Sequence, residues 1–146
     1  GSANVAMFNS VFKSIFAETV PLDGTETPRA LARRVDLVVQ PEVESYEFAT
    51  PADWDTDSFT VWITYRIKVM TAEGNLITSW PVRAYGASRH KLFGADDSLA
   101  DATTMAMRDA GAYVSLYFDD EPRIREWMRE EAARLKMKSR RPGKQR

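Results

Sequence analysis

Residues 59–86 constrain the fold of this chain more than any other segment, because apolar and polar side chains alternate along most of their length. The apolar positions are Phe59, Val61, Ile63, Tyr65, Ile67 and Val69 in the first half, and Leu76, Trp80, Val82 and Ala84 in the second. A repeat of two residues is typical of a strand that is buried on one face. Between the halves, Gly74 and Asn75 supply the left-handed backbone that a chain reversal needs. We therefore predict a long antiparallel hairpin with one apolar face, which requires helices to cover it.

Three other segments carry apolar residues at helical spacing. The first is residues 5–16, and it closes before Pro21 because proline disfavours a helical residue in front of it. A second helix is predicted to begin at about Leu99, with Ser98 as its N-cap. Its buried stripe is predicted to contain Leu99, Ala102, Ala106, Ala110, Tyr113 and Tyr117. Pro122 is well placed as the first residue of a third helix, which has a narrower apolar stripe.

Residues 33–48 read as a further strand, in which Pro41 removes a ladder donor and favours an edge position or a nearby bulge. Two polar segments, 21–28 and 49–58, read as loops. The order is therefore α-β-β-β-α plus a C-terminal helix. We predict an α+β two-layer sandwich, in which an antiparallel sheet of three to four strands carries helices on one face.

Charge is unevenly distributed along the chain, although the formal net charge is −1. Residues 1–121 contain 10 Lys and Arg against 18 Asp and Glu, whereas residues 122–146 contain 10 against 3. We predict a single α+β domain over residues 1–138 and a basic, disordered tail over residues 139–146. Such a tail either binds acidic partners, phosphates or anionic lipid head groups, or is simply solvated.

Length and composition exclude several classes of protein. A chain of 146 residues forms one domain with a real core. It has no cysteine, so disulfides and thiolate metal sites are excluded. No apolar run approaches the roughly 20 residues that cross a bilayer. Gly1-Ser2 resembles the remnant of a cleaved tag, so any signal peptide or lipid anchor is expected upstream of this sequence.

The sequence offers few candidates for catalysis or metal binding. His90 is the only histidine, and a lone histidine cannot form a multi-histidine metal site. The run Asp53, Asp55, Asp57 resembles the start of a calcium-binding EF-hand loop, but Ser58 and Thr64 stand where that loop needs glycine and glutamate. An acidic loop that caps or is solvated is the simpler interpretation. We therefore expect no catalytic residue, metal or cofactor, and no enzymatic activity.

A cluster of aromatic and basic side chains is the best candidate for binding. Trp62 falls on the polar face of its strand, beside Arg66, and Arg83 and Tyr85 can share that surface on the neighbouring strand. With Arg89, these residues are the predicted binding site. If a terminal helix or loop covers them they are structural, and if they are uncovered they form a patch suited to a protein partner or an amphipathic ligand.

The order of these segments adds a resemblance to a known group. The run S-W-P-V-R-A-Y-G, the helix S-L-A-D-A-T-T-M-A-M-R-D-A and the segment E-P-R-I-R-E-W-M are similar to the soluble domains of small proteobacterial envelope lipoproteins of the LptE, YajG and PelC type. The likeness covers residues 5–128. It implies a periplasmic accessory or adaptor domain, anchored to the outer membrane by an upstream lipid, which binds an envelope protein complex and has possible lipid or glycolipid contact.

Two alternatives come from other classes of function. Helix-strand-strand-strand-helix is also the order of a double-stranded-RNA-binding domain, which grips phosphates at the start of its last helix. Here Asp96, Asp97 and Asp101 stand at that position and would repel phosphate, so that only the basic C-terminal arm could bind nucleic acid. The other alternative is a small enzyme that uses carboxylates such as Asp53 or Asp57, and it requires a cleft with two convergent carboxyl groups.

Overall fold

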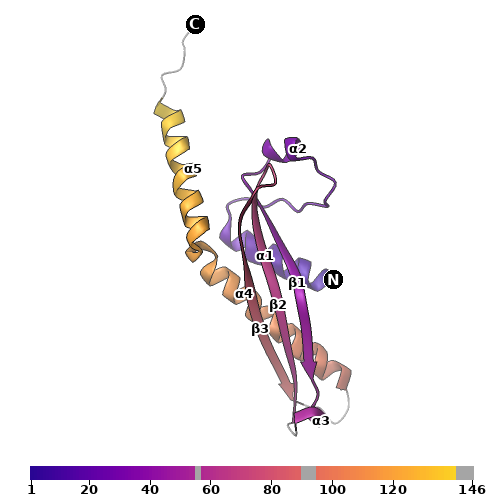
Figure 1. The fold of residues 1–146 in the computed structure, drawn as a ribbon. Helices are drawn as coiled ribbons and strands as arrows, with labels where there is room; N and C mark the ends of the chain where they lie inside the picture. Colours follow the sequence, from indigo (N-terminus) through magenta and orange to yellow (C-terminus); the bar gives the residue numbers. More distant parts are fainter. Residues whose placement is uncertain (55–56, 90–94, 141–146) are drawn as a thin grey trace.

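The computed structural model describes residues 1–54, 57–89 and 95–140, and in these residues it has one open antiparallel sheet of three strands with helices on one face (Figure 1). The strands are β1 (Leu37–Ala49), β2 (Ser58–Thr71) and β3 (Leu76–Arg89), in the order β1-β2-β3. The predicted α+β fold is therefore confirmed.

The hairpin of β2 and β3 has the predicted apolar face. All six alternating apolar residues of β2 are buried, as are Val82 and Ala84 of β3. Gly74 adopts a φ of +94° in the turn, a backbone region that favours glycine. Leu76 departs from the prediction and is 60% exposed. The register shifts between Val69 and Met70 on the way into the turn, so the simple alternation does not reach Leu76.

The strand predicted at residues 33–48 is β1, and it lies at an edge of the sheet, as Pro41 indicates. Its bulge is at Glu44, where the register with β2 shifts between Val43 and Ser45, three residues beyond the proline. The strand also starts later than the predicted residue 33. A short helix, α2 (Pro28–Ala32), precedes it, and the hydroxyl of Thr27 caps this helix by accepting from the Ala30 amide at 3.2 Å. A second short helix, α3 (Pro51–Trp54), lies in the polar segment between β1 and β2.

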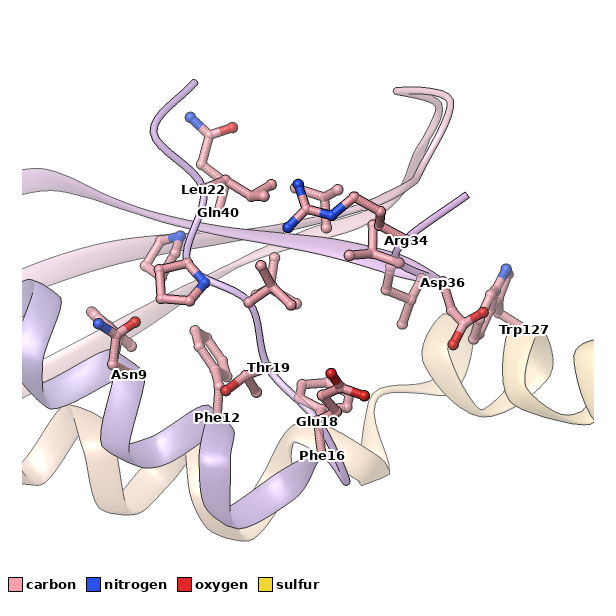
Figure 2. A pocket seen from close by; sticks show the side chains of 18 of the residues that line it. Asn9, Phe12, Phe16, Glu18, Thr19, Leu22, Arg34, Asp36, Gln40 and Trp127 are labelled. Atoms are coloured by element: carbon pink, nitrogen blue, oxygen red, sulfur yellow. The ribbon is translucent and has the colours of Figure 1, made fainter. Parts of the chain in front are cut away.

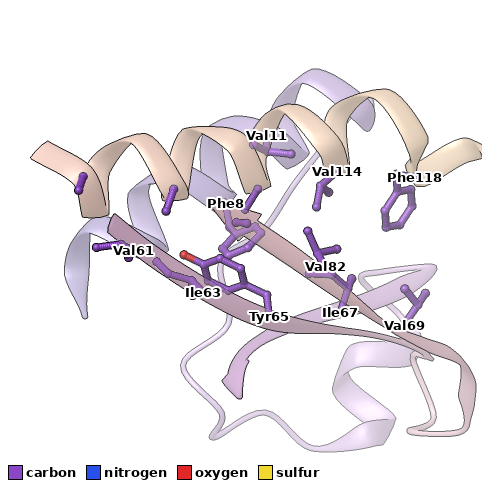
Figure 3. Packing of buried hydrophobic residues seen from close by; sticks show 14 of the residues in the cluster. Phe8, Val11, Val61, Ile63, Tyr65, Ile67, Val69, Val82, Val114 and Phe118 are labelled. Atoms are coloured by element: carbon purple, nitrogen blue, oxygen red, sulfur yellow. The ribbon is translucent and has the colours of Figure 1, made fainter. Parts of the chain in front are cut away.

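Two helices, α1 (Ser2–Ile15) and α4 (Ala95–Tyr117), cover the apolar face (Figures 1 and 3). The backbones of β3 and α4 come close together at Gly86, where an added Cβ would lie 2.5 Å from the Ala106 amide nitrogen and even closer to the Ala102 carbonyl oxygen. The alanines of α4 allow this approach, because their small side chains let the helix axis lie near the sheet. The core around this contact contains Phe8, Val11, Val61, Ile63, Tyr65, Ile67, Val69, Val82, Ala102, Ala106, Ala110, Val114, Phe118 and Ile124.

Two predictions for α4 are wrong. The helix starts at Ala95, so Ser98 is not its N-cap but a fully buried residue within it. The second half of the buried stripe is Val114 and Phe118, whereas Tyr113 and Tyr117 are 45% and 50% exposed. The buried side rotates around the helix because its neighbours change along its length. Alanines first meet β3, and Phe118, the first residue after α4, then packs edge-on against Phe12 of α1 and against Phe16, the first residue after α1, with ring centroids 6.2 and 5.3 Å away.

After a 3-10 turn, η1 (Phe118–Asp120), the chain enters α5 (Pro122–Arg140), which begins at the predicted proline. Ile124 is buried, but Met128, Leu135 and Met137 are 36%, 54% and 70% exposed, and the helix extends away from the sheet (Figure 1). On the surface of α5, Arg134 forms an ion pair with Glu131. Because α5 continues to Arg140, the first two residues of the predicted tail are helical, and residues 141–146 lie outside the described residues.

Within the described part of the chain, no helix has both the length and the apolar character to cross a membrane.

Candidate functional site

The five predicted binding residues lie on the face of the sheet opposite the helices. The register places Glu47, Trp62 and Tyr85 in one row across the three strands, and the rings of Trp62 and Tyr85 are 6.0 Å apart between centroids. Tyr85 is 52% exposed and Trp62 is partly exposed. Among the described elements, no helix lies over this face (Figure 1). We call this surface, with Arg66, Arg83 and Arg89, the open face.

The basic residues of the open face differ in their partners. The guanidinium of Arg66 forms an ion pair with Glu44 and donates to the Ser79 hydroxyl at 3.1 Å. Arg83, in the row beside Tyr85, and Arg89, at the end of β3, are exposed and form no ion pair with the described residues. Arg66 therefore holds β1 to β2, whereas Arg83 and Arg89 have charges that a partner can meet.

A residue of α4 fixes the position of Tyr85. The backbone amide of Tyr85 donates to the Asp109 carboxylate at 3.0 Å, on the outer edge of β3. Sequence reasoning missed Asp109 and also Glu47. Neither position carries a local signal, because each becomes part of the site only through the register of the sheet or the packing of α4.

A second feature is a partly open cleft of about 980 Å³ on the helix side of β1 (Figure 2). Its walls are α1, the segment 18–24, β1 with the residues before it, and the middle of α5, residues 127–135. Its apolar lining includes Phe12 of α1 and Phe16, the residue after that helix, together with Val35, Leu37 and Val39, and Trp127 lies at one end. This size and apolar lining are typical of ligand-binding clefts. The sequence did not predict the cleft.

Charged side chains lie at the rim of the cleft. The Glu131 carboxylate accepts a hydrogen bond from the Arg134 guanidinium, and this bond lowers the pKa of Glu131. The same bond, with the nearby charges of Glu131 and then Asp36, raises the pKa of Arg134. The Thr25 hydroxyl and amide both donate to Asp23 and lower its pKa. Glu18 and Arg34 complete the charged lining, so carboxylates outnumber guanidinium groups at this rim.

The other candidate residues have no shared site. Asp53 accepts from the amide and the hydroxyl of Thr50, both at 2.7 Å, and these bonds lower its pKa. This is the capping role expected for the acidic segment. Asp55 and His90 lie outside the described residues. Within the described ranges, no group of three or more His, Cys, Asp or Glu side chains is placed to hold a metal ion.

The fold and these two surfaces define an α+β domain with an open sheet. No protein-family model matches the sequence, and no curated protein matches it. Among solved structures, the chain is similar to the hypothetical protein CT253 from Chlamydia trachomatis, with 14% sequence identity and a TM-score of 0.40. The match covers 74% of this chain and 67% of that chain. A likeness at this level carries no argument about function.

Proposed function

We propose that the chain is a non-enzymatic binding domain of the bacterial envelope, which holds a partner protein on the open face as an accessory or adaptor in outer-membrane assembly or export. The observation that supports the proposal most directly is the pair of Trp62 and Tyr85 on a sheet face over which no described helix lies, beside Arg83, whose guanidinium forms no ion pair with the described residues. The periplasmic location and the lipid anchor are proposed from the sequence resemblance alone.

The residue types of the open face favour a protein partner. Tryptophan, tyrosine and arginine dominate the energy of protein interfaces, because they bury a large area and retain a polar group for hydrogen bonding. Here Trp62 and Tyr85 form the centre, and Arg83 and Arg89 lie on the β3 side. The matching partner surface has an apolar centre and a carboxylate that reaches Arg83.

The two alternatives receive less support from the geometry. Asp97 and Asp101 are exposed in the first turns of α4, where an RNA-binding domain of this topology needs positive charge. For a carboxylate enzyme, Asp53 is held by Thr50 in a capping interaction rather than directed at a cleft.

Site-specific photo-crosslinking of the full-length protein in cells tests the proposal. A crosslinker at position 85 should give an adduct with an envelope protein, identified by mass spectrometry, and the double variant Trp62→Ala, Arg83→Ala should lose that adduct. The matched control is a crosslinker at Tyr113, an exposed tyrosine on α4 that contacts Tyr117 instead of the sheet. It should not give the same adduct.

Membrane fractionation of the same cells tests the location. Recovery with the outer membrane agrees with the proposal. A protein in the soluble fraction with no adduct at position 85 contradicts it, and binding assays with RNA or DNA would then come next.

A further inference from the structure

β1 is an edge strand, and two prolines show which of its backbone hydrogen-bonding groups lie on the outer side of the sheet. In an antiparallel pair, opposed residues alternate between pairs that exchange backbone hydrogen bonds and pairs whose groups point away from each other. Pro81 of β3 has no N–H and is opposite Arg66, and the Tyr85 amide bonds to Asp109 rather than to β2. The backbone hydrogen-bonding groups of residues 81 and 85 therefore point away from β2.

The same alternation continues into β1. Arg66 is paired with Pro81 on one side without backbone bonds, so it bonds to Glu42 on the other side. The backbone groups of Pro41, the residue before Glu42, then point away from β2. The missing N–H of this proline therefore removes no bond between the strands, as expected for proline in an edge strand. Leu37 and Val39 have the same orientation, and their N–H and C=O groups lie on the outer edge.

These edge groups have no partner in the described part of the chain. Neither the backbone bonds outside regular elements nor the side-chain bonds involve the N–H or C=O of Leu37 or Val39 on that side. Their side chains share the face of Val69, the partner of Val39, and line the cleft beside α1. An unpaired edge and an apolar cleft therefore lie along the same five residues, 37–41.

The charge of β1 distinguishes between possible occupants of this edge. Residues 35–49 contain Asp36, Glu42, Glu44 and Glu47 and no lysine or arginine. A second copy that paired through its own β1 would place carboxylates opposite carboxylates, which is destabilising for a cross-strand pair. A strand with lysine or arginine would instead meet net negative charge, because Glu42 and Glu44 are paired with Lys68 and Arg66, whereas Asp36 and Glu47 form no ion pair with the described residues.

We propose that the outer edge of β1 at residues 37–41 binds an extended segment of a partner protein in which basic and apolar residues alternate. The segment adds as a fourth strand, bonds to the backbone of Leu37 and Val39, and places its apolar side chains in the cleft next to Phe12 and its basic side chains near the acidic residues of β1. This mode of strand addition obtains affinity from main-chain bonds and specificity from alternate side chains. The proposal is independent of the open face.

The test uses a fluorescent ten-residue peptide of alternating lysine and valine, with alternating glutamate and valine, and lysine and serine, as control peptides. Fluorescence anisotropy should show binding of the first peptide at least tenfold tighter than of either control. Val39→Pro, which removes the outward N–H, should reduce its affinity at least tenfold, whereas Val39→Ala, which keeps the N–H, should reduce it less. Circular dichroism shows whether both variants fold.

A second measurement does not depend on any variant. Amide hydrogen exchange of the wild-type protein, followed by NMR, should show that the first peptide protects Leu37 and Val39. Binding without this protection, equal binding of the acidic peptide, or no binding overturns the proposal. Dimerisation through β1 also overturns the proposal, because the occupant would then be a second copy. Tighter peptide binding after deletion of residues 141–146 overturns it as well, because the occupant would then be the chain's own end. The Trp62→Ala, Arg83→Ala variant should bind the peptide like wild type, which separates this proposal from that for the open face.

Discussion

The packing of α4 on the sheet leaves no room for a side chain larger than hydrogen at Gly86. A Cβ there would overlap backbone atoms of Ala102 and Ala106, and backbone atoms cannot move aside as a flexible side chain can. We expect Gly86→Ala to lower the free energy of unfolding by about 3 kcal/mol or more, measured by urea denaturation. Gly74→Ala is the control, because its φ of +94° is strained for alanine but its surroundings are open. Its cost should be about 1 kcal/mol, and an equal cost for both variants would contradict the packing argument.

Tyr65 links stability to alkaline pH. Burial raises its pKa to about 12, and its hydroxyl donates to Asn4 at 2.8 Å. In the unfolded chain a tyrosine loses its proton at a pH of about 10. Between these values the unfolded state releases a proton that the folded state keeps, so unfolding becomes more favourable as the pH rises. The contribution is complete below pH 10 and is lost as the pH approaches 12.

We therefore expect the free energy of unfolding to fall less between pH 9 and pH 12 in Tyr65→Phe than in wild type. At pH 7 the variant should cost about 1 kcal/mol, because Asn4 loses its partner. Urea denaturation across this pH range measures both effects, with Tyr85→Phe as an exposed control that should follow wild type. Parallel pH profiles for Tyr65→Phe and wild type would contradict the assignment.

The sequence predicted single residues well where one pattern decides their environment. In β2 a strand has two faces, so alternation was sufficient to place all six buried residues from Phe59 to Val69. In α4 the same kind of reasoning chose Tyr113 and Tyr117 instead of Val114 and Phe118. A helix can turn any side toward a neighbour, and the position of α1 beside α4 is not contained in a local pattern.

At the level of elements, the two short helices were missed although both carry the same signal. Thr27-Pro28 and Thr50-Pro51 each place a capping hydroxyl residue before a proline in the first helical position. Both prolines fall in the segments that we interpreted as polar loops, 21–28 and 49–58. Their helices have five and four residues, too few for an apolar stripe to appear, so the N-terminal motif is the signal that could have found them.

The two ends of α5 should contribute very differently to stability. Ile124 is 1% exposed, and removal of its side chain leaves a cavity in the core, so Ile124→Ala should cost about 2–5 kcal/mol. Leu135 is 54% exposed, so Leu135→Ala should change the free energy of unfolding by less than about 0.5 kcal/mol. Guanidinium denaturation of both variants checks this. A large cost at Leu135 would mean that the helix packs on the body more closely than the structure shows.

Across the whole molecule, protection from amide exchange should follow the arrangement of the layers. β2 is bonded on both sides and buried under α4, so its amides should exchange most slowly. Those of α5 beyond Met128 should exchange fastest among the helices, because their side chains are exposed. Hydrogen exchange with mass spectrometry measures both segments. Equal protection of β2 and the end of α5 would show that the helix is covered in solution.

The two candidate surfaces differ in how far the sequence could predict them. The open face follows from alternation, because Trp62, Arg66, Arg83 and Tyr85 occupy polar-face positions of a hairpin whose turn is recognisable. Glu47 joins their row only through the register of β1, which a bulge at Glu44 shifts. The cleft depends on how segment 18–24 and α5 lie relative to β1, and no periodicity encodes the distance between elements far apart in the chain.

The direction of α5 gives the molecule a strong electric dipole. The helix of 19 residues is about 28 Å long, several times the distance over which salt screens charge. Lys136, Lys138 and Arg140 lie at its far end, whereas the sheet and its covering helices are in the acidic part of the chain. Near a negatively charged surface the molecule would align with this helix foremost and its acidic body turned outward, and rising ionic strength would release that alignment.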